Sequence, residues 1–142
     1  MMNPQDGPIL VIDDDLEDLE LIRDVFVSIN VKNEILFFSS GPELLHFLRT
    51  SDKQAFFILC DINMPGMNGF TLREEINNDE ALKVKSIPFL FLSTSAKRTE
   101  VQKAYTLTVQ GYLKKPDSFS EYQELLKDTV AYWENCLHPN SF

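Results

Sequence analysis

Five short apolar runs alternate with longer segments whose apolar residues recur at helical spacing, and this alternation strongly constrains the fold. Strands that are each followed by a helix form a parallel sheet, and their right-handed crossovers place helices on both faces. The runs are continuously apolar, which indicates strands that are buried on both sides. We therefore predict a doubly wound α/β fold. The predicted strands cover residues 9–12, 34–38, 55–60, 89–92 and 110–113.

The expected helices carry apolar stripes at helical period, and two of them begin with a capping pattern. Ser40 is followed by Glu43, and Ser118 is followed by Glu121, which is the spacing of a capping box. The third helix could continue past Leu82. The expected helices lie around residues 19–29, 41–48, 70–76, 97–105 and 118–133.

The length of 142 residues and the net charge of −9 limit the classes of protein to consider. We expect one domain over residues 8–137, with flexible ends at 1–7 and 138–142. An acidic surface repels phosphate backbones and anionic lipid, so we expect neither a nucleic-acid partner nor a membrane. No apolar run approaches the roughly 18 residues of a membrane span, and no secretory signal is evident. A cytoplasmic location follows as the expectation.

Polar residues stand where four of the five predicted strands end. Asp13 and Asp14 follow the first strand, Asp61 follows the third, Ser93 follows the fourth, and Lys115 follows the fifth. In parallel sheets the carboxyl ends of the strands share one edge, where sites form. Three carboxylates gathered there would repel one another, so the site requires a cation. Oxygen ligands alone favour Mg²⁺.

This set of side chains is suited to phosphoryl transfer. A carboxylate such as Asp61, beside a divalent cation and an ammonium, can accept a phosphoryl group as an acyl phosphate. Lys115 would stabilise charge on the transferring oxygens. Ser93 could then donate a hydrogen bond to the bound group.

At these residues the chain resembles the response-regulator receiver domain of two-component signalling. The resemblance spans roughly residues 9–133 and depends on four fragments in order. It implies a flavodoxin-like receiver fold with strand order 2-1-3-4-5, in a stand-alone single-domain regulator. The fragments are Val11-Ile12-Asp13-Asp14, Asp61-Ile62-Asn63-Met64-Pro65-Gly66-Met67-Asn68-Gly69, Leu92-Ser93-Thr94-Ser95 and Lys114-Lys115-Pro116.

The resemblance also implies roles for the residues around the phosphoacceptor. Asp61 would take the phosphoryl group from a sensor histidine kinase or a histidine phosphotransfer protein. Asp14, Asp61 and the backbone carbonyl of Asn63 would ligate Mg²⁺, with Asp13 acting largely through water. Ser93 would bind the phosphoryl oxygens.

Further implications concern the fifth predicted strand and its end. Lys115 would bind the phosphoryl oxygens together with the hydroxyl on the fourth strand, and the Lys115–Pro116 bond would be cis. Tyr112 would be the aromatic switch residue that moves inward with Ser93. The phosphorylated state would change affinity for a downstream partner, and a homodimer is compatible with the family.

The sequence departs from the family pattern at two positions. Ser93 stands where Thr is commoner, and Thr94 stands where Ala or Gly is usual. We hypothesise that the bulk of Thr94 slows the entry of hydrolytic water.

The expected function is a phosphorylated switch that is not otherwise an enzyme, and other functions compete with it. One is a Mg²⁺-dependent phosphohydrolase that works through an aspartyl phosphate, although Asp61-Ile62-Asn63 has no second carboxylate two residues on. Another is a degenerate receiver that docks a partner without being phosphorylated. A nucleotide-binding protein is disfavoured because the chain has no Gly-rich phosphate loop.

Overall fold

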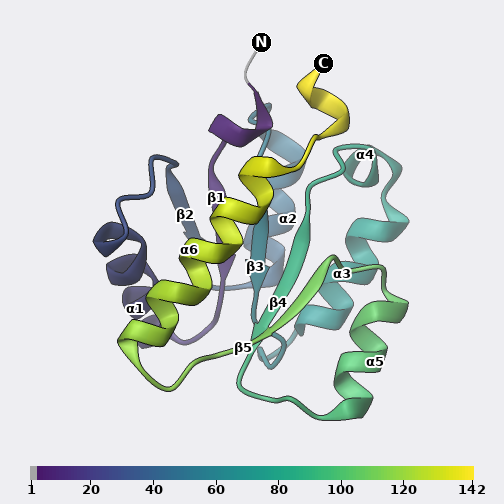
Figure 1. Cartoon of the computed structure of the whole chain (residues 1–142). Helices are drawn as coiled ribbons and strands as arrows, with labels where there is room; N and C mark the ends of the chain where they lie inside the picture. The colour runs from purple at the N-terminus through teal and green to yellow at the C-terminus, as the bar shows by residue number, and fades with distance from the viewer. Residues whose placement is uncertain (1–2) are drawn as a thin grey trace.

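The computed structural model describes residues 3–142 and shows a five-stranded parallel sheet covered by helices on both faces (Figure 1). The strands follow the order β2-β1-β3-β4-β5, and every neighbouring pair is parallel. The doubly wound fold and the order 2-1-3-4-5 are therefore confirmed. The strands are β1 (Ile9–Ile12), β2 (Ile35–Phe38), β3 (Ile58–Cys60), β4 (Phe89–Ser93) and β5 (Gly111–Lys114).

Two hydrophobic clusters flank the sheet, one on each face. Helices α1 and α6 pack on one face, and helices α2 to α5 pack on the other (Figure 1). Because both faces are covered, β1, β3 and β4 are buried along their whole length, which explains their continuously apolar sequences. The helices are α1 (Leu16–Ser28), α2 (Gly41–Thr50), α3 (Gly69–Asn78), α4 (Glu80–Lys83), α5 (Arg98–Thr106) and α6 (Phe119–Asn135).

The predicted capping residues begin the helices as expected. The Ser40 side chain accepts a hydrogen bond from the Glu43 N–H, and the Ser118 side chain accepts one from the Glu121 N–H. The third helix does not continue past Leu82. Instead it ends at Asn78, because Asp79 has extended backbone angles and caps the short helix α4.

No peptide bond within residues 3–142 is cis, so the Lys115–Pro116 bond is trans. The prediction of a cis bond is therefore wrong. The Lys115 N–H donates to the Ser93 carbonyl at 2.8 Å, so the β4–β5 pairing continues to the residue before the proline. An X–Pro bond favours trans by about 0.5–1 kcal/mol, and the trans chain already brings Lys115 to the site described below.

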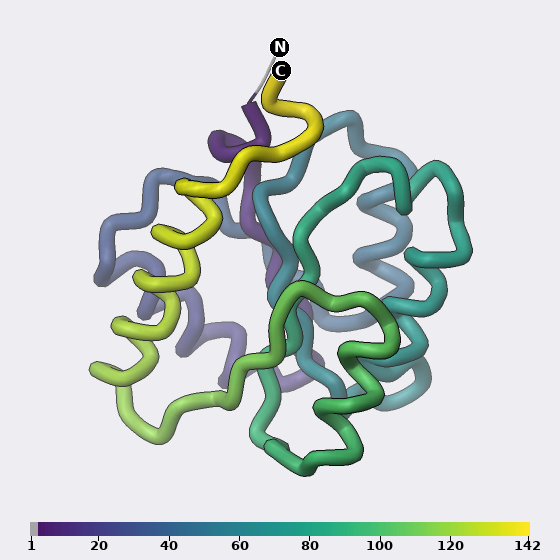
Figure 2. Tube along the Cα trace, turned by 45° about the vertical axis from the view of Figure 1, so that its right-hand side comes forward, coloured from purple at the N-terminus to yellow at the C-terminus, as the bar shows by residue number. Residues whose placement is uncertain are grey.

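Both chain ends contain a short 3-10 helix, at Pro4–Asp6 and Pro139–Ser141, where flexible segments were predicted. The ends lie near each other, at the amino ends of the strands (Figure 2). The Gln5 side-chain amide donates to the Glu134 carbonyl at 2.6 Å, which ties the first segment to α6. Residues 1 and 2 lie outside the described part of the chain. No helix within residues 3–142 is long and apolar enough to cross a bilayer.

Candidate functional site

Three aspartates meet at the carboxyl ends of the neighbouring strands β1 and β3. Asp13 and Asp14 follow the last residue of β1, and Asp61 follows the last residue of β3. One carboxylate oxygen from each lies within 4.8 Å of the others. Asp13 is 2% exposed and Asp61 is 9% exposed, whereas Asp14 is open to solvent. The predicted convergence of the three carboxylates is thus present in the structure.

Lys115 joins this cluster from the end of β5. Its Nζ lies 2.8 Å from Asp13 Oδ2 and 3.5 Å from Asp61 Oδ1. It also donates to Asp18 Oδ2 at 2.8 Å, a contact that the sequence did not reveal. Asp18 lies in the first turn of α1, where an acidic residue is already explained by the helix dipole. Its second role depends on the tertiary packing of α1 against the sheet.

Burial raises the pKa of Asp61 to about 6, and the neighbouring charge of Asp13 adds to the effect, while Lys115 opposes it. Burial also raises the pKa of Asp13, against the hydrogen bond from Lys115. Burial by itself would lower the pKa of Lys115, but the hydrogen bonds from its ammonium to Asp13 and Asp18, together with the negative charges of Asp13 and Asp61, outweigh burial and raise it. At neutral pH the site therefore holds a protonated Lys115 beside an ionised Asp61 carboxylate.

The charge balance at this site fits a divalent cation. Asp13, Asp14, Asp18 and Asp61 supply four carboxylates, and within residues 3–142 Lys115 is the one cation that pairs with any of them, at Asp13, Asp18 and Asp61. At an effective dielectric near 20, two like charges about 5 Å apart repel by about 3 kcal/mol. The donor set consists of carboxylate oxygens only, which suits Mg²⁺.

The loop after β3 holds Asp61 in place through backbone contacts. The Asp61 N–H donates to the Ile12 carbonyl at 2.9 Å, which locks the start of the loop to β1. The Gly69 N–H donates to the Ile62 carbonyl at 2.8 Å. A Cβ on Gly69 would lie 2.5 Å from the Asp61 carbonyl oxygen, so the close return of the chain requires glycine. Asn63 is exposed within this loop, and its carbonyl as a metal ligand stays a prediction.

Ser93 and Tyr112 lie on the neighbouring strands β4 and β5. Ser93 is fully buried, and its Oγ accepts a hydrogen bond from the Ser95 N–H at 3.2 Å. The Tyr112 hydroxyl donates to the Ser95 carbonyl at 2.7 Å, and its ring meets the Phe91 ring edge-on at 6.2 Å. Both predicted switch residues thus contact the segment after β4, in which Thr94 is exposed. Movement of Tyr112 stays a prediction.

Comparison with known proteins agrees with this geometry. Residues 9–127 match the family described as response regulator receiver domain. Chemotaxis protein CheY-3 of Vibrio cholerae is 30% identical over 118 residues, which cover 83% of this chain and 87% of that protein. Response regulator Rcp1 of Synechocystis is 25% identical over 130 residues, covering 88% and 87% respectively. The crystal structure of the phosphorylated cyanobacterial phytochrome response regulator RcpA superposes with a TM-score of 0.79 at 27% identity, covering 92% of this chain and 96% of that one.

Proposed function

The chain belongs to the response regulator receiver family and is a two-component response regulator, and on that premise we propose that Asp61 is its phosphoacceptor. The donor is the phosphohistidine of a sensor histidine kinase or of a phosphotransfer protein. The observation that carries the proposal is the placement of Asp61, with its carboxylate 3.5 Å from the Lys115 ammonium and beside two further carboxylates.

The proposed step uses the ionised form of Asp61. One carboxylate oxygen forms a bond to phosphorus, the P–N bond of the phosphohistidine breaks, and the imidazole nitrogen keeps the electron pair. The pKa of Asp61 is about 6, which leaves the carboxylate ionised at neutral pH and more basic than an exposed aspartate. The Lys115 ammonium supports the transfer by placing positive charge next to the phosphoryl oxygens.

Asp13, Asp14 and Asp61 are the side chains that would hold Mg²⁺, and the Asn63 carbonyl is proposed as a further ligand. When bound, the ion supplies positive charge that stabilises the oxygens of the transferring group. Without such a cation, three carboxylates within 4.8 Å would repel an incoming phosphoryl group.

We place the output of the switch on the segment between β4 and β5. The Ser93 hydroxyl, whose oxygen accepts from the Ser95 N–H, is proposed to donate its hydrogen to the phosphoryl group and to move toward it together with Ser95. Tyr112 would then follow because its hydroxyl bonds to the Ser95 carbonyl. Exposed residues on α5, such as Tyr105 at 52% exposure, provide a face whose partner affinity can respond. A population shift of this kind needs only a few kcal/mol.

Phosphorylation of purified protein by labelled acetyl phosphate and Mg²⁺ tests the proposal. We expect about one phosphate per wild-type chain and no label on Asp61→Asn. Asp117→Asn is the matched control, because Asp117 is an exposed aspartate two residues beyond Lys115, outside the carboxylate cluster. Undiminished labelling of Asp61→Asn would refute the assignment.

The same assay separates the two rival functions. A phosphohydrolase would release many phosphates per chain from a phosphate ester, whereas a switch stops near one. A docking module that is never phosphorylated would take no label from any donor. Removing the metal with EDTA should abolish labelling of the wild type if the carboxylate cluster acts as proposed.

A further inference from the structure

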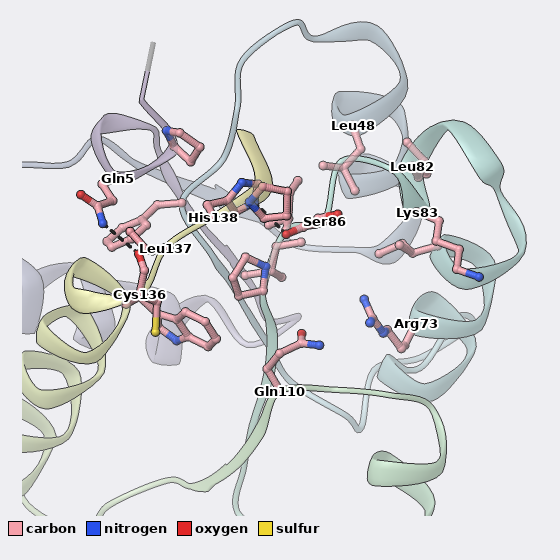
Figure 3. Close-up of a pocket in the computed structure, with 18 of the residues that line it drawn as sticks. Gln5, Leu48, Arg73, Leu82, Lys83, Ser86, Gln110, Cys136, Leu137 and His138 are labelled. Atoms are coloured by element: carbon pink, nitrogen blue, oxygen red, sulfur yellow. Dashed lines mark hydrogen bonds between the residues drawn. The ribbon is translucent and has the colours of Figure 1, made fainter. Parts of the chain in front are cut away.

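A second cavity lies at the amino ends of β3, β4 and β5, at the opposite end of the sheet from the aspartates (Figure 3). Its volume is about 340 Å³. That falls within the range of about 300–1,000 Å³ that is typical of small-molecule sites. Figure 3 shows Arg73, Leu82 and Lys83 on one side of the cavity, and Gln5, Cys136 and Leu137 on the other.

Most of the cavity wall is apolar. Side chains from α2, α3, α4, α6 and the segments before β3 and β4 contribute to it. Trp133, the only tryptophan of the chain, is half-buried there and presents an aromatic surface. The wall thus favours the apolar body of a ligand. Its principal apolar residues are Leu48, Phe56, Ile76, Leu82, Ile87 and Trp133.

The wall formed by the C-terminal segment is held by specific hydrogen bonds. The ring of His138 is buried, and its Nδ1 accepts from the Asn140 N–H at 2.9 Å. The other ring nitrogen, Nε2, therefore donates to the Ser86 carbonyl at 2.8 Å. The Asn140 side chain also donates to Gln54 Oε1 at 3.0 Å. These contacts fix residues 138–140 to Ser86 and Gln54, so this wall of the cavity is in place before any ligand binds.

Arg73 is a buried cation without a counter-ion in this cavity. It is 8% exposed, and no carboxylate oxygen in the described chain lies within 4.0 Å of it. Two of its five N–H donors bond to the carbonyls of Leu107 and Thr108, at 3.2 and 3.0 Å. The guanidinium also lies over the Phe89 ring at 5.1 Å. Buried charges are normally paired, so Arg73 has unused capacity for an anion.

Lys83 adds a second positive charge to the cavity rim. It is exposed and takes part in no ion pair within residues 3–142. The chain as a whole carries −9, yet the cavity lining contains these two cations and no aspartate or glutamate. The cavity lining is therefore positively charged although the protein as a whole is negative, and it complements an anionic ligand.

We propose that this cavity binds a small apolar carboxylate, whose carboxylate pairs with Arg73 and whose apolar body packs against Trp133, Ile76 and Leu82. The planar guanidinium matches a carboxylate in two parallel hydrogen bonds. Lys83 contributes longer-range attraction from the rim. The site is separate from the phosphoacceptor and does not depend on the function proposed for Asp61.

Fluorescence of Trp133 gives a direct assay with the full chain. We expect 4-tert-butylbenzoate and octanoate to change it saturably, with a Kd below about 1 mM, at about pH 7.5. The neutral analogue 4-tert-butylbenzamide has the same apolar body and should bind at least about tenfold more weakly. In Arg73→Gln, which keeps amide donors for the two carbonyls, the preference for benzoate over benzamide should fall to about one.

A second variant does not alter the buried arginine. Leu137 lines the cavity but is 80% exposed, so Leu137→Glu should fold and place a negative charge opposite Arg73. We expect it to weaken benzoate binding at least about tenfold and benzamide binding less. Asp61→Asn and the exposed α6 variant Lys127→Gln are controls that should bind like the wild type.

Three results would overturn the site. The first is no saturable change with either carboxylate below about 1 mM. The second is equal affinity of the wild type for benzoate and benzamide, because a carboxylate pairing with Arg73 must be preferred over a neutral amide. A benzoate preference that survives in both Arg73→Gln and Leu137→Glu would place the ligand elsewhere and equally reject the proposal.

Discussion

Asp61→Asn should make the metal-free protein more stable, although it removes the proposed phosphoacceptor. Asp61 is 9% exposed and lies beside Asp13, so its ionised form is costly in the folded state. The amide of the variant has nearly the same shape and carries no charge. We therefore expect a higher free energy of unfolding for the variant at neutral pH in EDTA.

The magnitude follows from the pKa of Asp61, which burial raises from 3.8 to about 6. Each unit of difference between the folded and unfolded pKa values corresponds to about 1.4 kcal/mol. The ionised carboxylate therefore lowers the free energy of unfolding by about 3 kcal/mol above pH 6. Between these two pKa values the folded state binds more protons than the unfolded state, so stability falls as pH rises. Asp61→Asn should thus gain about 2–3 kcal/mol at about pH 7.5 and only about 0.5 kcal/mol at about pH 4.

Urea unfolding monitored by Trp133 fluorescence measures this difference. Urea titrations of both proteins are made in EDTA at about pH 7.5 and at about pH 4. If the m-values of the two proteins agree, the difference between their urea midpoints reports the difference in stability. The titration is then repeated with Mg²⁺, which should stabilise the wild type by binding only its folded state. The variant lacks one carboxylate of the cluster and should gain less, so the gap between the two proteins narrows.

Equal stability of the wild type and the variant at about pH 7.5 in EDTA would show that the ionised Asp61 carboxylate does not destabilise the fold, as would a difference in stability that does not shrink in acid. Asp52→Asn is the matched control, because Asp52 is exposed and remote from the carboxylate cluster. It should shift stability by no more than about 0.5 kcal/mol at either pH.

Three other variants test the rest of the site. Lys115→Met should lower the free energy of unfolding by about 3–5 kcal/mol, because Asp13 is left buried without its partner at 2.8 Å; an unchanged urea midpoint would contradict this. Gly69→Ala should cost about 1–3 kcal/mol, since its Cβ would lie 2.5 Å from the Asp61 carbonyl oxygen; a thermal melt equal to wild type would show that the loop adjusts freely. Thr94→Ala should speed loss of the phosphoryl label by opening the exposed approach to the site; an unchanged dephosphorylation rate would discard that hypothesis.

The site residues that could be found from the sequence share one property, which is that each stands at the end of an apolar run. Asp13, Asp61 and Lys115 are brought together by the pairing of parallel strands, and this pairing was predictable because the runs and their helices alternate regularly. In a parallel sheet the residues that follow each strand lie at the same edge, and this does not depend on the exact length or packing of the helices. The family fragments then supplied the strand order.

Asp18 illustrates what a local pattern could not reveal. An acidic residue in the first turn of α1 is explained by the helix dipole alone. Its carboxylate nevertheless accepts a hydrogen bond from Lys115, which lies 97 positions further along the chain and also binds Asp13. That contact depends on where α1 rests on the sheet. The Lys115–Pro116 bond, which the family resemblance led us to expect as cis, is trans in this structure.

The α/β class and the edge of the sheet that carries the acidic site could be predicted from periodicity and from the residues at the strand ends, because both follow from short-range order and the parallel connections. In contrast, the burial of Arg73 with no carboxylate within 4.0 Å among residues 3–142, and the cavity that residues 136–139 help to line around it, depend on the tertiary structure. The burial of a charged side chain depends on which distant segments cover it. The sequence of α3 does not indicate that His138 and its neighbours lie at the amino ends of the strands, where His138 bonds to Ser86.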